Sequence, residues 1–185
     1  MNIQYLNEGR LYLVAINEQI STIHKIIESW DWYDKNMQSK NLSTNANKFD
    51  IIDSKGIDYY NSDNHVIWEP SSKKGTTIIR TEGDGTPFLR SLSFSGIKCY
   101  YIRIHNDIYS AYSFIKMGTN GDCERVIQYI EEGGQTEFYE EGKTLAFEKK
   151  EYYKKKRKKD RFTPKIIVEY ISSLGWNILD DNFWL

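Results

Sequence analysis

The sequence contains few of the residues on which enzymes and metalloproteins usually depend. Its 185 residues include only three histidines and two cysteines. His24, His65 and His105 lie about forty residues apart, and none has partners in the pattern of a metal site. Cys99 and Cys123 fall on separate predicted strands without metal-ligand spacing, which favours two reduced, half-buried thiols. The sequence therefore predicts no metal and no cofactor.

Sequence motifs of catalysis are missing as well. No serine has the flanking glycines of a nucleophile elbow, and neither cysteine has the local signature of a nucleophile. The glycine-rich stretch from Thr81 to Pro87 lacks the lysine and the strand-to-helix context of a phosphate loop, so it is interpreted as a turn. We therefore expect a protein that is not an enzyme. The rival hypothesis is a small hydrolase that uses Asp84 or His105.

Long hydrophobic runs are also absent. No window approaches the roughly 18 to 20 apolar residues that a membrane span requires. The N-terminal stretch has neither the basic start nor the apolar run of a secretory signal. These absences predict a cytoplasmic protein with no membrane partner.

The residues that are present are sufficient for a globular core. Hydrophobic residues make up 39% of the chain and aromatic residues 15%, including five Trp and fourteen Tyr. That content is enough to offset the chain entropy lost on folding. A chain of this length predicts a single domain spanning 1–185, and a subdivision near residue 95 is the alternative.

The N-terminal half begins with a strand and a helix. Residues 10–16 are β-branched and aromatic, which is typical of a strand. Apolar residues at three- and four-residue steps predict a helix over 18–30. Its apolar face consists of Ile20, Ile23, Ile27 and Trp30. The polar stretch 36–48 predicts a surface loop, and two short strands are expected near 65–69 and 75–81.

The most regular pattern extends from residue 98 to residue 141. Apolar and polar residues alternate along its segments, as they do along half-buried strands. The segments are separated by turn dipeptides, namely Asn106-Asp107, Asn120-Gly121 and Gly133-Gly134. The sequence therefore predicts an antiparallel meander of about four strands, extended by the N-terminal strands, in an α+β fold.

The C-terminal part has a helical period. Good helix formers without Gly or Pro predict a helix over 148–160. A second helix is predicted over 164–174, with Thr163 as its N-cap and Gly175 as its stop signal. The tail ends in large apolar groups, so we expect it to pack on the core or to belong to an interface.

The charges are strongly segregated, although the net charge of the chain is only −1. From Glu124 to Glu141 there are six carboxylates and one arginine, and from Lys143 to Arg161 there are ten basic and three acidic residues. The basic segment predicts nucleic-acid contacts, a solvated helix face that pairs with the acidic hairpin, or a contact with a protein partner. The nucleic-acid alternative would use Lys154, Lys155, Arg157 and Lys158. An isoelectric point near 6.3 and the lack of a recognition motif favour the solvated face.

The C-terminal part also carries a pattern of short pairs and single residues. They are Phe147-Glu148, Tyr152-Tyr153, Arg157, Asp160-Arg161, Glu169-Tyr170 and Leu174-Gly175. Together they resemble the tail of small cytosolic immunity proteins found beside bacterial polymorphic or contact-dependent toxins. The resemblance implies a non-enzymatic inhibitor that binds a toxin domain. It implies no binding residue, because such proteins share a role rather than a site.

Two surfaces are candidates for binding a protein partner. The first is the acidic hairpin, formed by Glu131, Glu132, Glu137, Glu140 and Glu141 with the neighbouring Tyr139. The second is the helix-end cluster with Trp32 and Tyr33, beside Trp30 and Asp31. Buried aromatics would supply affinity, and charges would select the partner. The alternatives are a plain acidic surface for the hairpin and a core position for Trp30.

Overall fold

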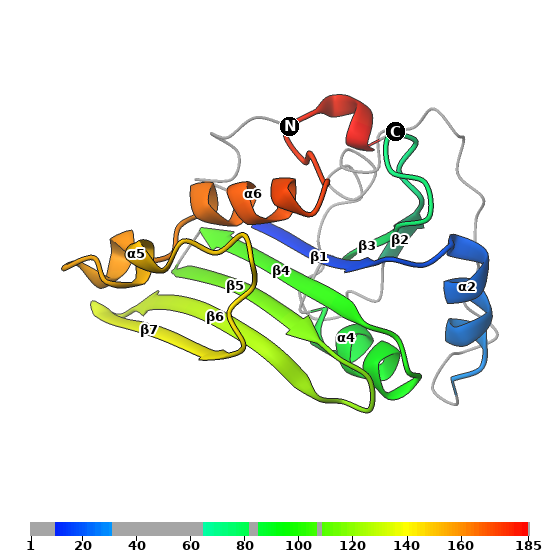
Figure 1. Ribbon diagram of the computed structural model, residues 1–185, viewed down its shortest axis with the longest axis horizontal. Helices are drawn as coiled ribbons and strands as arrows, with labels where there is room; N and C mark the ends of the chain where they lie inside the picture. Colours follow the sequence, from blue (N-terminus) through cyan, green and yellow to red (C-terminus); the bar gives the residue numbers. More distant parts are fainter. Residues whose placement is uncertain (1–9, 31–64, 82–84, 107–108, 185) are drawn as a thin grey trace.

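The computed structural model describes residues 10–30, 65–81, 85–106 and 109–184, which are shown in colour in Figure 1. These residues form an α+β fold around an antiparallel sheet of seven strands in the order β2-β3-β1-β4-β5-β6-β7. The strands are β1 (Arg10–Ile16), β2 (His65–Trp68), β3 (Thr77–Thr81), β4 (Cys99–Asn106), β5 (Ser110–Met117), β6 (Cys123–Glu132) and β7 (Gln135–Gly142). The helices are α2 (Ile20–Glu28), α4 (Thr86–Phe94), α5 (Lys150–Tyr153) and α6 (Pro164–Ser173), with 3₁₀ turns η1 (Lys158–Asp160) and η2 (Asp181–Trp184). The predicted fold class is confirmed.

The first strand of the chain lies inside the sheet. β1 pairs antiparallel with both β3 and β4, so it joins the N-terminal strands to the meander. The helix predicted over 18–30 is present as α2, in which Ile23 and Ile27 are buried. The surface loop predicted at 36–48 lies outside the described residues.

The predicted meander is confirmed as strands β4 to β7. Asn120 and Gly121 have φ values of 63° and 81°, and the Asp122 amide donates to the Thr119 carbonyl over 3.4 Å. This is a two-residue turn whose twist matches that of the flanking strands. Gly133 and Gly134 also have positive φ and join β6 to β7 in the same way. The turn dipeptides therefore set the register of the last three strands.

Each face of the sheet has its own apolar cluster, because successive strand residues point to opposite faces. Leu11 and Leu13 of β1 belong to the cluster that packs against α6 and the C-terminal tail. Val14 and Ile16 belong to the cluster that packs against α2 and α4. In Figure 1, α6 lies above β4 and α4 lies below it. The sheet is therefore the middle layer of the described structure.

The helix predicted over 148–160 is wrong as a continuous element. It is replaced by the single turn of α5 and the 3₁₀ turn η1, separated by an extended residue, Arg157, with ψ of 126°. A short helix is stabilised mainly by packing of an apolar face. Tyr153 is buried, but Lys154 to Lys159 offer only exposed charged side chains. The second predicted helix is confirmed as α6, and the Thr163 hydroxyl caps it by accepting the Ile166 amide.

Helix α4 was not predicted. The turn expected from Thr81 to Pro87 lies partly outside the described residues, and Thr86 and Pro87 already belong to the helix. Only nine residues long, α4 buries Phe88, Leu89 and Leu92 between polar residues. That pattern is too short for its period to stand out in the sequence.

The C-terminal tail packs on the core, which is one of the two arrangements expected from its sequence. Trp176, Ile178, Phe183 and Trp184 are all at most 1% exposed. The indole of Trp184 donates to the Ile178 carbonyl over 2.9 Å. Among the helices that the structure describes, none is long and apolar enough to cross a membrane.

Candidate functional site

Strand β7 lies at the end of the sheet order among the described strands. As in any β-strand, its successive side chains point to opposite faces of the sheet. Phe138 and Glu140 stand opposite Tyr129 and Ile127 of β6, which belong to the cluster beneath α6. The other face carries Glu137, Tyr139 and Glu141, which stand opposite Ile130, Gln128 and Val126.

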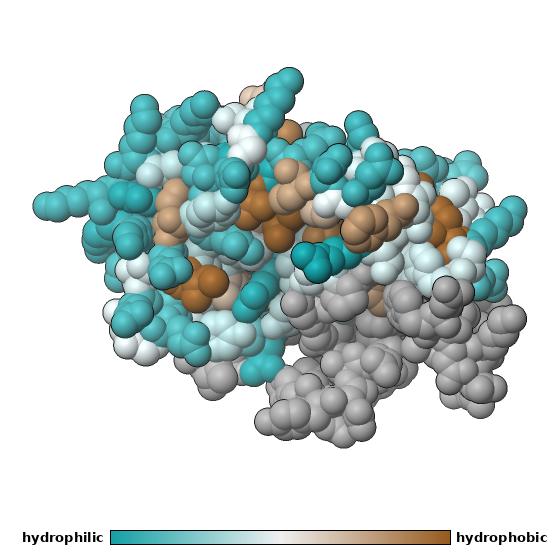
Figure 2. All heavy atoms as spheres, turned by 90° about the horizontal axis from the view of Figure 1, so that it is seen from below, coloured by the Kyte–Doolittle hydropathy of each residue, from teal (hydrophilic) through white to brown (hydrophobic). Residues whose placement is uncertain are grey.

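We call the second set the acidic face, defined as Glu137, Tyr139 and Glu141 of β7 together with Ile130 of β6. Tyr139 is 49% exposed and Ile130 is 36% exposed, and both carboxylates are exposed. In Figure 2, the coloured part of the surface shows small hydrophobic areas enclosed by hydrophilic residues. On the acidic face, Tyr139 lies between Glu137 and Glu141 along β7, and Ile130 stands opposite Glu137.

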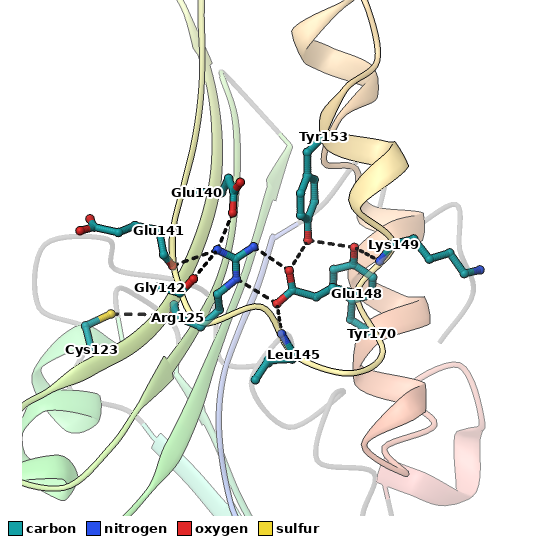
Figure 3. A network of polar contacts seen from close by, with 10 residues as sticks. All are labelled: Cys123, Arg125, Glu140, Glu141, Gly142, Leu145, Glu148, Lys149, Tyr153 and Tyr170. Carbon is teal, nitrogen blue, oxygen red and sulfur yellow. Dashed lines mark hydrogen bonds and ion pairs between the residues drawn. The ribbon is translucent and has the colours of Figure 1, made fainter.

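The position of β7 is fixed by a buried charged network (Figure 3). Arg125 of β6 is 1% exposed and Glu148 is fully buried. The Arg125 guanidinium donates to both oxygens of Glu148, with Nε to Oε1 at 2.9 Å and Nη2 to Oε2 at 2.6 Å. Its Nη1 lies 2.5 Å from the Glu140 carboxylate and donates to the Glu141 carbonyl over 3.0 Å. One side chain thus binds β7 and the segment before α5 to β6.

Further hydrogen bonds surround Glu148. Its Oε1 accepts the Leu145 amide over 2.9 Å, and its Oε2 accepts the Tyr153 hydroxyl over 2.9 Å. The Tyr153 hydroxyl also lies 2.9 Å from that of Tyr170. A buried carboxylate with this many donors avoids the cost of an unpaired charge. The network therefore acts as a structural clamp between the sheet, α5 and α6.

The clamp shifts the pKa values of Arg125 and Tyr153. Burial opposes the charge of Arg125, but the hydrogen bonds and charges of Glu148 and Glu140 outweigh it and raise the Arg125 pKa above its ordinary value. Burial raises the pKa of Tyr153 well above its ordinary 10.0, and the contacts with Tyr170 and Glu148 raise it further. The arginine is therefore held charged, and the tyrosine is held neutral.

The predicted hairpin carboxylates do not form a single surface. Glu137 and Glu141 lie on the acidic face, whereas Glu140 points at Arg125 (Figure 3). Glu131 accepts the Tyr129 hydroxyl over 2.6 Å, and Glu132 is exposed at the end of β6, before the turn. The structure thus brings only two of the five predicted carboxylates together with Tyr139.

The second candidate surface is only partly described. Trp32 and Tyr33 lie outside the described residues. Trp30 packs on Phe88 of α4 with ring centroids 5.6 Å apart, and its indole donates to the Ser95 hydroxyl. Trp30 is therefore partly buried against the cluster beside α2 and α4, and the core position suggested for it is confirmed only in part.

The basic segment contacts β7 without pairing with its carboxylates. Lys154, Lys155, Arg157 and Lys158 are all exposed. Lys158 donates to the Thr136 main-chain carbonyl over 2.9 Å, and Arg157 pairs with Asp160 over 2.6 Å. Within the described part of the chain, no side chain from Lys154 to Lys159 forms an ion pair with a β7 carboxylate. The expectation that this segment pairs with the acidic hairpin is therefore wrong for side-chain charges.

The residues of the rival hydrolase hypothesis are not brought into a described site. Asp84 lies outside the described residues. His105 is buried within β4, where its Nδ1 lies 2.6 Å from the Tyr12 hydroxyl and its ring stacks on Tyr109. Among the described residues, no group of three His, Cys, Asp or Glu side chains could hold a metal ion.

Two features of the sequence point to the clamp. Arg125 shares the alternation of Ile127 and Tyr129, so it had to point into the same buried layer. A buried arginine requires an anionic partner, and Glu148 is the acidic residue of the Phe147-Glu148 pair.

A comparison with known proteins finds no matching protein-family model, no matching curated protein and no matching solved structure.

Proposed function

We propose that this chain is a non-enzymatic protein-binding module, and specifically an immunity protein that neutralises a cognate bacterial toxin by direct binding. The observation that carries the proposal is the acidic face on an edge strand. Tyr139 and Ile130 are large and exposed, whereas large apolar side chains in the described structure are mostly buried. An exposed aromatic beside a second apolar group is typical of the centre of a protein interface.

The charges of the acidic face define the partner. Glu137 and Glu141 flank Tyr139 along β7, with Ile130 opposite Glu137, and they would attract a basic surface. A toxin domain that cuts nucleic acid needs such a surface to hold phosphate groups. An inhibitor that covers this surface would prevent the substrate from binding. The resemblance of the C-terminal residue pattern to immunity proteins supports the same role.

Nucleic-acid binding through the basic segment is the second candidate function. Lys154, Lys155, Arg157 and Lys158 are exposed on one short stretch, which is the arrangement that phosphate contacts require. Arg157 and Lys158 already bind Asp160 and the Thr136 carbonyl. The two candidates use different residues, so they can be separated by mutation.

The test uses the protein encoded next to this gene as the partner. Its C-terminal domain is expressed with and without this chain, and the complex is measured by titration calorimetry and by growth of the producing cells. We expect a one-to-one complex and rescue of growth. The double variant Glu137→Lys with Glu141→Lys should bind at least about tenfold more weakly, because charge complementarity becomes repulsion.

A matched control carries the same change in charge elsewhere. Glu18 and Glu28 are exposed and lie just before α2 and at its end, at the opposite side of the described structure from β7 (Figure 1). The variant Glu18→Lys with Glu28→Lys should bind like the unmodified chain. Equal binding by both double variants would reject the acidic face as the binding surface. Glu140 is left unchanged, because reversing it would place a cation against Arg125.

A further inference from the structure

Among the described strands, none pairs with the side of the β7 main chain that faces away from β6. In an antiparallel pair, the N–H and C=O groups of alternate residues point toward the neighbouring strand and away from it. The two-residue turn at Gly133-Gly134 makes Glu132 and Gln135 the hydrogen-bonded pair that closes the hairpin. Thr136, Phe138 and Glu140 therefore direct their main-chain groups away from β6.

A contact at Thr136 confirms this direction. Its carbonyl accepts a hydrogen bond from the Lys158 ammonium, which comes from η1 and not from β6. Phe138 and Glu140 are two and four residues further along the same strand, so their outward groups lie on the same edge. No hydrogen bond from another described residue reaches the main-chain groups of Phe138 or Glu140 on this side.

The charges at this edge select what could pair with it. Glu137 and Glu141 lie on one face of β7 and Glu140 on the other, so carboxylates flank the edge on both sides. A second copy of the chain would place its own carboxylates beside these, and like charges on adjacent strands are destabilising. A basic segment would instead pair with them. Lys158 on the Thr136 carbonyl shows that this edge already binds a cation.

We propose that an extended, basic segment of the protein partner adds to the free edge of β7 as a further strand. It would form main-chain hydrogen bonds with Phe138 and Glu140, and its basic side chains would lie beside Glu137 and Glu141. This inference rests on the proposed function and names its binding mode. Main-chain pairing would supply affinity, and the alternate side chains would supply specificity. Edge carboxylates that serve only to prevent aggregation are the competing explanation.

Amide hydrogen exchange of the full chain, followed by NMR, tests the edge directly. In the free protein, the amides of Phe138 and Glu140 should exchange rapidly, whereas that of Tyr139 should be protected by its bond to β6. The probe is a blocked nine-residue peptide of alternating Lys and Val at millimolar concentration. Binding should slow exchange at Phe138 and Glu140 by at least about tenfold.

Two control peptides separate pairing from charge attraction. A peptide with Glu in place of Lys, and a Lys-Val peptide with alternate N-methyl groups, should leave both exchange rates unchanged. Slowing by the methylated peptide equal to that by the probe would overturn the proposal, because that peptide cannot complete the strand pairing. Peptide-induced shifts without any slowing would also overturn it, since they would show charge attraction alone.

A variant pair tests the same edge in the complex with the neighbouring gene product. Glu140→Ala and Glu140→Pro both lose the carboxylate, but only the proline variant loses the outward N–H. If the two variants unfold at the same urea concentration, the proline variant should bind the neighbouring gene product at least about tenfold more weakly than the alanine variant. Equal binding would overturn strand addition and leave the proposed function standing. If the peptide slows exchange at Phe138 and Glu140 but the neighbouring gene product forms no complex with this chain, only the proposed function would be rejected. If the proline variant fails to fold, the exchange experiment decides.

Discussion

Arg125 and Glu148 form a buried bidentate ion pair, with Nη2 2.6 Å from Oε2 and Nε 2.9 Å from Oε1. The two residues are 23 positions apart in the sequence, on β6 and just before α5. Because Arg125 also binds Glu140 and the Glu141 carbonyl, the pair determines where β7 lies. The acidic face therefore depends on a contact made on the opposite face of the sheet.

Breaking this pair should strongly destabilise the fold. Glu148→Gln leaves the buried Arg125 charge with only the 40% exposed Glu140 as its anionic partner, and Arg125→Met leaves Glu148 without its cation. Each change should lower the free energy of unfolding by about 3 to 5 kcal/mol, measured by urea denaturation. As a control, Lys116→Ala removes a more exposed pair with Glu124 and should cost less than about 1 kcal/mol. Equal small losses in all three variants would show that the clamp does not determine stability.

Alkaline pH should destabilise the protein more steeply than its surface tyrosines alone would. Burial raises the pKa of Tyr129, Tyr153 and Tyr170 above the ordinary 10.0, so the fold favours the neutral phenols. Their contribution is complete below pH 10 and is lost as pH rises above it, because the unfolded chain then releases the protons first. Urea midpoints between pH 8 and pH 11.5 should fall, and the fall should be shallower in Tyr153→Phe. An identical pH profile in that variant would contradict the assignment.

The meander could be predicted because its turns carry their own chemistry. Asn120-Gly121 and Gly133-Gly134 require positive φ, and the structure has it at all four residues. The break between α5 and η1 could not be predicted from propensity, since Lys and Arg are good helix formers. It results from the lack of an apolar face after Tyr153, which is a matter of packing. Propensity thus failed where tertiary contacts decide.

The candidate site was predicted only in part, for a related reason. Counting carboxylates from Glu124 to Glu141 treats the hairpin as one charged surface, but a strand directs alternate residues to opposite faces. Glu137 and Glu141 share the face of Tyr139, whereas Glu140 is engaged by Arg125. The alternation was visible in the sequence, but which face is covered depends on α5 and α6. That information comes only from the packed structure.

Gly142 should not tolerate a side chain. Its φ is +91°, and an added Cβ would lie 2.2 Å from the Glu124 carbonyl oxygen. Since that oxygen belongs to the main chain, it cannot move aside cheaply. Gly142→Ala should lower the free energy of unfolding by about 1 to 3 kcal/mol, measured by thermal and urea unfolding. Gly133→Ala is the control, because it has a positive φ of 58° but meets no atom within 4 Å. A smaller loss at Gly142 than at Gly133 would contradict the close approach.

The basic segment should bind nucleic acid only weakly. Lys154 to Lys159 are exposed, but Arg157 is paired with Asp160 and the Lys158 ammonium binds the Thr136 carbonyl. The carboxylates of β7, which lies beside the basic segment, would also repel phosphate groups. We expect elution from a phosphate resin at low salt, and no change in this behaviour for the variant Lys155→Glu with Lys158→Glu. Tight binding to random DNA or RNA that falls steeply with salt, because counterions are released at each phosphate contact, would favour the nucleic-acid function instead. If the Lys155→Glu, Lys158→Glu variant lost this nucleic-acid binding and the Glu137→Lys, Glu141→Lys variant kept it, the function would belong to the basic segment and not to the acidic face.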